Sequence, residues 1–280
     1  MSAFNICIIR PQGYLFSSVF FELAELIAFS LEDNGHSVRI AENHLDSSAQ
    51  NLVIGCHLID IQQTSLIPRG TIILNTEQIG VGHAKWNQRV IHFLKQFPSW
   101  DYSHENIAVL KQLGITSTRF FQIGYHPRLN RIRSDIPNDI DVLFYGALNS
   151  PRTLILDAIE KRGAKVTRLF GVFGNDRDQY IARSKVVLNL HQHSTKIFEI
   201  VRAHYLMNNK KVIISQFDAD TKIDSRYAAG LILSKVEDIA ETCIQTIHSD
   251  QVLKEFEQRS LDAIMKFDSV KIMQDLIAPL

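Results

Sequence analysis

The stretch VVLNLHQHSTKIFEIVRAHYL, residues 186–206, joins two apolar segments through a strongly polar turn. Its first residues form a short apolar run typical of a buried strand, and residues 195–209 have the spacing of a helix. The turn between them carries two imidazoles and two hydroxyl groups, and Lys196, Glu199 and Arg202 follow. In open parallel sheets, ligands bind beyond the carboxyl ends of the strands, where loops and helix N-termini meet. The stretch therefore predicts a strand, a ligand-binding turn and a helix.

The same alternation of strand and helix runs along the whole chain. Short strands that are apolar on both faces and alternate with helices indicate a parallel sheet covered on both sides. We expect strands at 5–10, 37–43, 51–57, 71–79 and 119–127, and again at 141–147, 165–171, 186–191, 211–216 and 231–234. We expect the main helices at 19–35, 87–97, 104–114, 150–163, 175–184, 195–209 and 236–249. The predicted fold class is therefore α/β, with two doubly wound halves in tandem.

A polar, charged segment over residues 126–141 separates the two halves and is the best candidate for a linker. We therefore expect an N-terminal domain over 1–132 and a C-terminal domain over 139–250. The remaining residues, 251–280, have helical periodicity throughout. We expect these terminal helices to pack back across both domains.

Composition narrows the classes of partner. The 280 residues include 45% hydrophobic and 21% charged residues, which is typical of a globular protein. The formal net charge is zero, so the sequence lacks the basic excess that nucleic-acid binding usually requires. We expect no nucleic-acid partner.

The cysteines and the apolar segments indicate a compartment. Cys7, Cys56 and Cys243 are odd in number and lack metal-type spacing, so we expect buried, reduced thiols. The first residues show neither a basic region nor a long apolar region of a signal peptide, and no apolar run is long enough to span a bilayer. We therefore expect a cytoplasmic protein with no transmembrane segment.

Two loops of the first half combine glycine with polar side chains at predicted strand ends. The loop PQGYLFSS contains Gln12, Gly13 and Tyr14, and the glycine permits close approach of a ligand to the backbone. The loop NTEQIGVGHAKW contains Glu77 and Gln78. A carboxylate in that position can act as a general base. An ordinary turn and a solvated loop are the alternatives at these two places.

Two loops of the second half have features that suit a nucleotide. In YGALNSPR, Gly146 ends a strand, and Asn149 and Arg152 lie at a helix start whose N–H groups suit a phosphate. In LFGVFG, Gly171 and Phe173 provide a flexible turn and an apolar surface that could accept a flat base. An ordinary helix start and a plain turn are the alternatives.

The polar turn of the opening stretch adds further candidates. Ser194 or Thr195 is expected to cap the following helix, and Lys196 adds positive charge beside that helix end. His191 and His193 resemble the start of a metal site, but no further ligands follow at helical spacing, so we expect no metal. Glu199 and Arg202 are three residues apart on the predicted helix, and a modest surface ion pair is the alternative interpretation of that spacing.

Residues 141–235 resemble the donor-binding domain of bacterial GT-B glycosyltransferases of the "glycosyl transferases group 1" kind, in particular the compact branch that includes spore-coat glycosyltransferase-like proteins. The segments that carry the likeness are DVLFYGALNSPR, LFGVFG and KVVLNLHQHSTKIFEIVRAHYLMNNKKVIIS. In that family a Glu-x7-Glu pattern spans this turn and helix. Glu199 matches the second glutamate, whereas His191 occupies the position of the first.

The resemblance implies two Rossmann-like domains that face each other across a cleft, with the nucleotide sugar on the second and the acceptor on the first. It implies no cofactor and no metal, because helix dipoles and basic side chains stabilise the departing diphosphate. Glu199 would hold the ribose, Lys196 and Arg152 the diphosphate, and His191 the sugar or leaving group, with Glu77 as a candidate base. The other residues placed at the donor are Gly146, Asn149, Gly171, Phe173, His193, Ser194 and Thr195, and those on the acceptor side are Gln12, Gly13, Tyr14 and Gln78.

Three functions remain open at this point. The resemblance favours a metal-independent glycosyltransferase that moves a sugar from a nucleotide-diphosphate sugar to a glycan, a protein or a small molecule. His191 in place of the usual glutamate keeps open an inactive nucleotide-sugar-binding or accessory protein of the same fold. A sugar-nucleotide epimerase built from two Rossmann-like domains is the third possibility.

Overall fold

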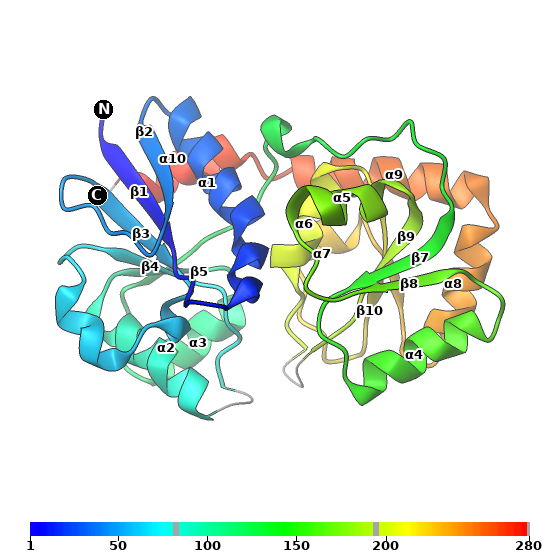
Figure 1. Cartoon of the computed structure of the whole chain (residues 1–280), viewed down its shortest axis with the longest axis horizontal. Coiled ribbons are helices and arrows are strands. Elements are labelled where there is room, and N and C mark those ends of the chain that lie inside the picture. Colours follow the sequence, from blue (N-terminus) through cyan, green and yellow to red (C-terminus); the bar gives the residue numbers. More distant parts are fainter. Residues whose placement is uncertain (81–83, 193–195, 279–280) are drawn as a thin grey trace. The chain divides into compact units, whose positions relative to one another are not determined.

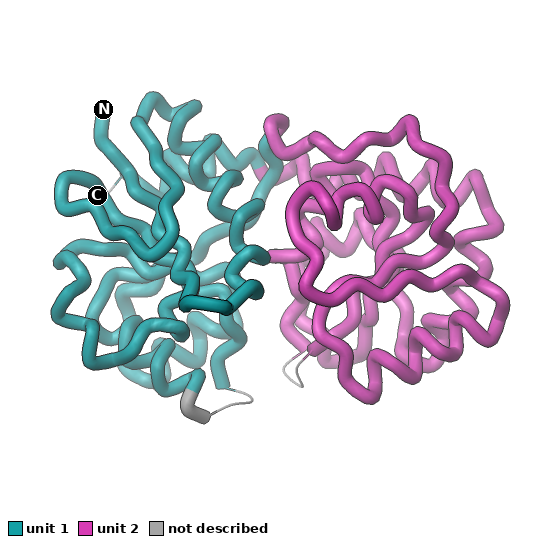
Figure 2. Tube along the Cα trace, viewed as in Figure 1, with its two compact units in different colours: residues 1–126, 268–280 teal, residues 127–267 magenta. Residues whose placement is uncertain are grey.

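The computed structural model describes residues 1–80, 84–192 and 196–278, and the chain divides into two compact units (Figure 2). Unit 1 comprises residues 1–126 and 268–280, and unit 2 comprises residues 127–267. The chain therefore passes from unit 1 to unit 2 within the polar segment expected to be a linker, and it returns to unit 1 near its end. The terminal helices expected over 251–280 are divided between the two units.

The described part of unit 1 contains a six-stranded sheet in the order β2-β1-β3-β4-β5-β6, and every neighbouring pair is parallel (Figure 1). Its strands are β1 (Ala3–Ile8), β2 (Ser37–Glu42), β3 (Gln50–Ile54), β4 (Ile72–Asn75), β5 (Ser99–Asp101) and β6 (Thr118–Phe120). The helices of this unit are α1 (Phe21–Asp33), α2 (Ala84–Gln96), α3 (His104–Gln112) and α10 (Ser269–Ile277), with shorter 3-10 helices η1 (Leu15–Phe20), η2 (Cys56–Leu58) and η3 (Ile61–Leu66).

The C-terminal helix α10 belongs to unit 1 because it packs against α1 (Figure 1). The Ser30 hydroxyl donates to the Ser269 hydroxyl at 2.9 Å, and the Asn34 side-chain amide donates to the Val270 carbonyl at 2.8 Å. These contacts join residues more than 230 positions apart in the sequence. Local sequence patterns do not encode such a pairing.

Unit 2 contains a five-stranded parallel sheet in the order β11-β10-β9-β7-β8. Its strands are β7 (Ile140–Tyr145), β8 (Val166–Leu169), β9 (Ser184–Asn189), β10 (Val212–Gln216) and β11 (Ile232–Ser234). Its helices are η4 (Pro127–Leu129), α4 (Ser150–Glu160), α5 (Gly174–Ala182), α6 (Ile200–Asn208), α7 (Ser225–Ala228), α8 (Ile239–Ile247) and α9 (Asp250–Met265).

The two sheets share one strand order. Numbered within its own unit, each runs 2-1-3-4-5, and unit 1 carries a sixth strand at the far edge. In this order the second strand is added on one side of the first strand and the third strand on the other side. In such sheets, ligands bind at this switch point between the first and third strands. The switch points lie between β1 and β3 in unit 1 and between β7 and β9 in unit 2.

Buried β-branched residues hold the central strands together. In unit 2, Val142 of β7 pairs with Val186 of β9, which pairs with Val212 of β10, and all three are buried. Branched side chains pack well on the pleated surface of a sheet. The helices α4 and α8 cover the same core through Leu156, Ile159 and Cys243, among other residues.

Several predicted elements differ from the structure. Helix α6 begins at Ile200 rather than at residue 195, because residues 196–198 pair with another segment: the Phe198 N–H donates to the Lys222 carbonyl, and the Lys222 N–H donates to the Lys196 carbonyl, each at 3.1 Å. The predicted strand over 119–127 is shortened to β6. The sequence pattern does not predict β5, since it is three residues long and includes two polar residues.

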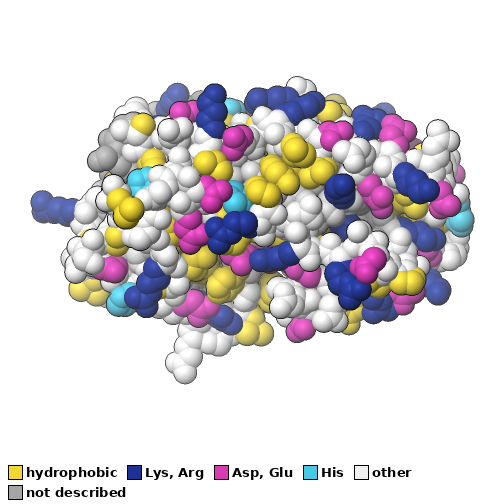
Figure 3. Space-filling view, turned by 90° about the horizontal axis from the view of Figure 1, so that it is seen from above, with side chains coloured by type: hydrophobic (Ala, Val, Ile, Leu, Met, Phe, Trp, Pro, Cys, Tyr) yellow, Lys and Arg dark blue, Asp and Glu magenta, His cyan; other side chains and the backbone are white. Residues whose placement is uncertain are grey.

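The charged side chains, the cysteines and the helices can be compared with the expectations from composition. Figure 3 shows basic and acidic side chains interspersed over the face drawn there. Cys7, Cys56 and Cys243 are free and buried, as predicted. Within residues 1–80, 84–192 and 196–278, no helix is both long and apolar enough to cross a membrane.

Candidate functional site

A pocket of about 210 Å³ lies at the carboxyl end of the unit 2 sheet. The loop after β7, the start of α4, the loop after β9 and the end of β10 contribute its walls. The pocket therefore includes the switch point between β7 and β9. It is lined by Asn149, Pro151, Arg152, Ile155, His191, Gln192, Lys196, Gln216 and Val236.

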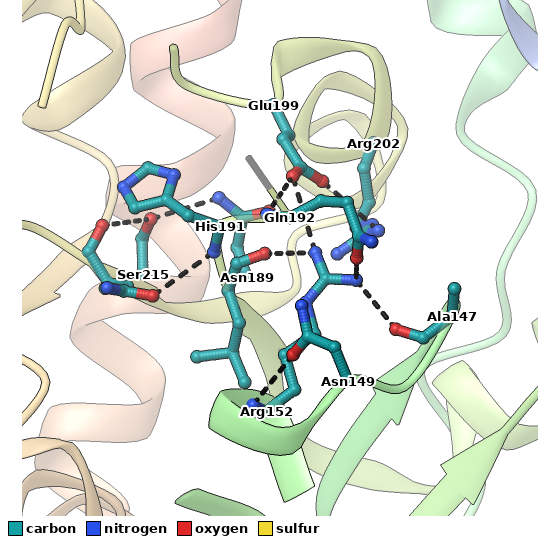
Figure 4. A network of polar contacts seen from close by, with 11 residues as sticks. Ala147, Asn149, Arg152, Asn189, His191, Gln192, Glu199, Arg202 and Ser215 are labelled. Carbon is teal, nitrogen blue, oxygen red and sulfur yellow. Dashed lines mark hydrogen bonds and ion pairs between the residues drawn. The ribbon is translucent and has the colours of Figure 1, made fainter. Parts of the chain in front are cut away.

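Arg152 is the centre of a polar network behind this pocket (Figure 4). Its guanidinium donates to the Ala147 carbonyl at 2.8 Å, to the Leu190 carbonyl at 2.5 Å and to the Gln192 side-chain oxygen. Its Nη2 also lies 3.4 Å from Glu199 Oε1, and the arginine side chain is only 2% exposed. The guanidinium thus joins the loops after β7 and β9, which a lysine could not do because it lacks the planar fork of donors.

Arg152 is positioned by the first turn of helix α4. The Asn149 side-chain oxygen accepts a hydrogen bond from the Arg152 N–H at 3.0 Å and caps the helix, and Pro151 lies in its first turn. Both residue types are favoured at helix starts. The first turn of α4 therefore points the arginine under the turn that follows β9.

Glu199 lies between two arginines (Figure 4). Its Oε1 accepts from the Gln192 N–H at 3.2 Å and faces Arg152, and its Oε2 lies 3.2 Å from Arg202 Nη2. Glu199 occupies the N-cap position of α6 but makes no capping hydrogen bond, because its carboxylate turns toward the arginines. A carboxylate has about four lone-pair sites, so this one, at 17% exposure, retains capacity for a ligand hydroxyl.

Aromatic rings and a glycine support the two guanidinium groups. Arg152 lies 5.3 Å from the Phe144 ring centre, and Arg202 lies 5.4 Å from that of Tyr145. Gly146 has φ +133°, and a Cβ there would lie 3.0 Å from Arg202 Nη2. A larger residue at 146 would be strained and would push Arg202 away.

Burial lowers the pKa of two side chains that line this pocket, Arg152 and His191. Desolvation lowers the pKa of Arg152 to about 10, although the charge of Glu199 opposes the shift. Arg152 therefore stays charged at neutral pH. Desolvation also lowers the pKa of His191 below its ordinary value, against the charges of Glu199 and Asp218, so the imidazole is neutral at pH 7.

His191 also lines the pocket and is held by contacts of its own (Figure 4). Its Nε2 lies 3.2 Å from the Thr221 hydroxyl, and its backbone N–H donates to the Gln216 side-chain oxygen at 3.2 Å. A neutral imidazole with one nitrogen so occupied can offer its other nitrogen as a single hydrogen-bond donor or acceptor. The side chain is placed to contact a ligand rather than to compensate a charge.

Lys196 does not lie at a helix end, contrary to prediction. It has a left-handed backbone with φ +50°, and its Nζ contacts Asp218 at 3.1 Å and Asp220 at 2.8 Å. The pairing of residues 196–198 with Lys222 draws the lysine toward this acidic loop. Lys196 lines the pocket, but a phosphate would have to compete with two carboxylates for its charge.

The pocket gathers some predicted donor residues and not others. Asn149, Arg152, His191 and Lys196 line it, and Glu199 and Gly146 contact its arginines. Gly171, with φ +71°, and Phe173, at the N-cap of α5, follow β8 and are not among the lining residues. The predicted residues His193, Ser194 and Thr195 lie outside the described part of the chain.

Among the polar residues of the site, Gln192, Arg202 and Gln216 were not predicted as binding residues. Gln192 follows a predicted residue, and Arg202 is three positions after Glu199, so the helical spacing carried a usable signal for it. Gln216 lies at the end of the neighbouring strand β10, which only the sheet order brings close.

A second cluster lies at the switch point of unit 1. Glu77 follows β4, and its Oε1 is 3.4 Å from Nδ1 of His57, which follows β3. The His57 ring stacks on Trp86 with the ring centres 4.2 Å apart. Burial and then the charge of Glu77 raise the pKa of Tyr14, which follows β1, so the phenol lies near the carboxylate.

The electrostatics of this cluster suit proton transfer. Burial raises the pKa of Glu77 to about 6, and burial together with the charge of Arg89 lowers the pKa of His57 to about 3. The pair is thus a carboxylate beside a neutral imidazole at pH 7, not an ion pair. A base that titrates close to the working pH is efficient in general base catalysis.

The other predicted residues of the first half are sequence neighbours of Tyr14 and Glu77. Gln12 and Gly13 form an exposed turn after β1, where Gly13 has φ +76°. Gln78 is half-buried and follows Glu77 directly. In the described ranges of both units, no group of three or more His, Cys, Asp or Glu side chains is arranged to hold a metal ion.

Solved structures with the same arrangement of elements are glycosyltransferases. The T4 phage β-glucosyltransferase in complex with UDP-glucose matches with a TM-score of 0.60 at 11% identity, over 100% of this chain and 99% of the enzyme. AviGT4, a glycosyltransferase involved in avilamycin A biosynthesis, matches with a TM-score of 0.57 at 10% identity, over 99% and 96% of the two chains. The fold is GT-B. A glycosyltransferase from Rickettsia africae matches this GT-B chain with a TM-score of 0.54 at 9% identity, over 99% and 97%.

Comparison of sequences gives less information on function than comparison of structures. No family model matches the chain. Three uncharacterized proteins of Acanthamoeba polyphaga mimivirus are 27%, 30% and 25% identical over 62%, 56% and 73% of this chain. The matched regions span only 58%, 21% and 23% of those proteins.

Proposed function

We propose that this protein is a metal-independent glycosyltransferase that moves a sugar from a nucleotide-diphosphate sugar to an acceptor hydroxyl. The observation that carries the proposal is Glu199, which is held between Arg152 and Arg202 at the switch point of the unit 2 sheet of a GT-B fold. Its partly exposed carboxylate suits the hydroxyl groups of a ribose.

The roles of the other residues follow from their positions. Arg152 and Lys196 supply positive charge for the diphosphate, and Lys196 would exchange Asp218 or Asp220 for a phosphate oxygen. Arg202 adds charge on the other side of Glu199. Neutral His191 is proposed to hydrogen-bond the donor sugar or the leaving group. Metal independence is proposed because these side chains supply the cationic stabilisation themselves.

Unit 1 supplies the candidate base. Glu77 is proposed to take the proton of the acceptor hydroxyl, since burial brings its pKa to about 6 and keeps it ionised at neutral pH. Tyr14 lies near this carboxylate. Gln12 and Gly13 directly precede Tyr14 in the sequence, and Gln78 directly follows Glu77. We place the acceptor at this cluster.

We also propose a cytoplasmic location. The three cysteines are free and buried, with no disulfide among them, as is usual where thiols stay reduced. Cell fractionation with an antibody against the protein tests this location, and recovery from an oxidising compartment would contradict it.

A ligand screen tests the donor site first. Nucleoside diphosphates and their sugars are added separately in the presence of EDTA, and the melting temperature is measured, since a ligand that binds only the native state raises it. We expect one nucleotide series to stabilise the protein and Glu199→Gln to remove that shift. Glu241→Gln is the control, because Glu241 pairs loosely with Arg162 on the surface of the same unit, 3.9 Å apart. No shift with any nucleotide would refute the proposal.

A product assay then separates the three functions. The stabilising donor is incubated with glycans, proteins and small hydroxyl compounds, still in EDTA. Duplex DNA is included because one solved neighbour is described as a DNA-modifying β-glucosyltransferase, although the zero net charge makes DNA the acceptor least expected here. Transfer supports the proposal, a new sugar nucleotide without acceptor indicates an epimerase, and binding without turnover indicates an accessory protein.

A further inference from the structure

Asp101 is a fully buried acid without a basic partner. In the part of the chain that the structure describes, no Lys, Arg or His side chain forms an ion pair with it. Three N–H donors surround it instead: the Asn75 amide at 2.6 Å, the Ser103 backbone at 2.8 Å and the Asn106 amide at 3.1 Å. A carboxylate buried without a cation is costly, and the hydrogen bonds offset only part of that cost.

The two amides that face Asp101 also hold the backbone of Glu77. The Asn75 and Asn106 side-chain N–H groups donate to the Glu77 carbonyl at 2.9 and 2.8 Å. In return, the Asn75 side-chain oxygen accepts from the Glu77 N–H at 3.1 Å, and the Asn106 oxygen accepts from the Ile79 N–H at 2.9 Å. The two amides therefore form a clamp on the segment after β4, which holds the carbonyl and N–H of Glu77 and the N–H of Ile79.

Asp101 decides the orientation of both amides. An asparagine amide can be turned over, which exchanges its donor and acceptor sides. Burial raises the pKa of Asp101 to about 7, so the acid is only partly ionised at neutral pH. In the structure its oxygens nevertheless act as acceptors, and each amide directs an N–H toward them. That orientation leaves one N–H of each amide for the Glu77 carbonyl and the amide oxygens for the N–H groups of Glu77 and Ile79.

We infer that Asp101, acting through Asn75 and Asn106, is a positioning residue that fixes the Glu77 backbone and so holds the Glu77 carboxylate against His57. The inference rests on the proposed function for its catalytic consequence, whereas the positioning itself is independent of it. Elements β4, β5 and α3 each contribute one member, so the clamp is anchored at three points of the sheet edge. None of the three side chains needs to touch the substrate.

Asn106→Ala tests the inference, because it removes the bonds to the Glu77 carbonyl, to Ile79 N–H and to Asp101. Asn51→Ala is the matched control. Asn51 is also buried in unit 1 and also clamps a loop, through Asp46, but it lies near the amino end of β3. Its loss therefore disturbs a comparable network at the opposite end of the strand from the Glu77 cluster.

The first measurement does not depend on activity. The carboxyl group of Glu77 is titrated by NMR in the wild type and both variants. We expect Asn106→Ala to move its midpoint from about 6 toward the ordinary value, since a released segment exposes the carboxylate to water. Asn51→Ala should leave the midpoint unchanged. An unchanged midpoint in Asn106→Ala would overturn the inference, and Asn75→Ala gives the same test if Asn106→Ala does not fold.

The second measurement uses the transfer assay. We expect Asn106→Ala to lower kcat by about 10²-fold, since displacement of a reacting group by about 1 Å has effects of this size. The increase in melting temperature caused by the donor should remain in this variant. The acid limb of its pH–rate profile should move to lower pH along with the NMR midpoint. Unaltered transfer in Glu77→Gln would disprove the proposed base and leave the positioning result standing, so the two failures are distinguishable.

Discussion

Nη2 of Arg152 lies 3.4 Å from Oε1 of Glu199, and the two side chains are 2% and 17% exposed. The arginine is the more deeply buried partner and lines the pocket, and the glutamate is the more exposed of the two. Glu199 neutralises a buried guanidinium, and its partly exposed carboxylate is the group proposed to hold the ribose. This double role determines how substitutions at either residue should behave.

Glu199→Gln should weaken nucleotide binding by at least about tenfold. The amide keeps the shape of the side chain but leaves Arg152 and Arg202 facing each other without a negative charge, and it weakens the contact to a ribose hydroxyl. Calorimetric titration with the stabilising nucleotide measures the change. Equal affinities in Glu199→Gln and wild type would show that the nucleotide does not contact this carboxylate.

Arg152→Lys should destabilise the protein by about 3–5 kcal/mol, because it breaks a buried pair and leaves several carbonyl acceptors without donors. The melting temperature should fall by several degrees. Arg162→Lys is the control, since Arg162 is exposed and its substitution should change stability by less than about 0.5 kcal/mol. Similar small shifts in both variants would mean that a lysine satisfies the site.

Gly146→Ala should impair donor binding as well as stability. An added Cβ would be strained at φ +133° and would lie 3.0 Å from Arg202 Nη2, which displaces the arginine from Glu199. Gly163→Ala is a matched comparison, because Gly163 also has positive φ, +94°, but nothing lies within 4 Å of the Cβ position. We expect both to cost about 1–3 kcal/mol in stability and only Gly146→Ala to raise the Kd.

Glu77→Gln should abolish transfer and, at high pH, stabilise the protein. The pKa of Glu77 is raised from 4.5 to about 6 in the folded state, so folding disfavours its ionised form. The contribution of Glu77 to the stability of the wild type is therefore greatest below pH 4.5 and falls as pH rises through 6, by about 2 kcal/mol in total. Glutamine does not ionise and avoids this loss.

Melting temperatures of Glu77→Gln and wild type, measured between pH 5 and 8, check the prediction. The difference in favour of glutamine should grow across this range and level off above pH 7. Glu42→Gln serves as the control, because Glu42 is exposed at the end of β2. A pH-independent difference would show that Glu77 is not desolvated.

Local sequence patterns predict the α/β class, the two halves and most strands, because short apolar runs between helices are typical of a parallel sheet covered on both faces. Arg152 is a candidate because it stands at a predicted helix start, and Glu199 because it matches the second glutamate of the family that the segment resembles. These are local patterns. Each depends on residues that are neighbours in the chain.

The contacts that those candidates make depend on the folded chain. Lys196 is predicted beside a helix end, but pairing with Lys222 places it against Asp218 and Asp220, residues that local spacing cannot connect to it. Likewise, strand order brings Asp101 next to Asn75, 26 positions away, and makes a buried acid into part of a clamp. Burial and long-range hydrogen bonds set these outcomes, and both exist only once the sheets have formed.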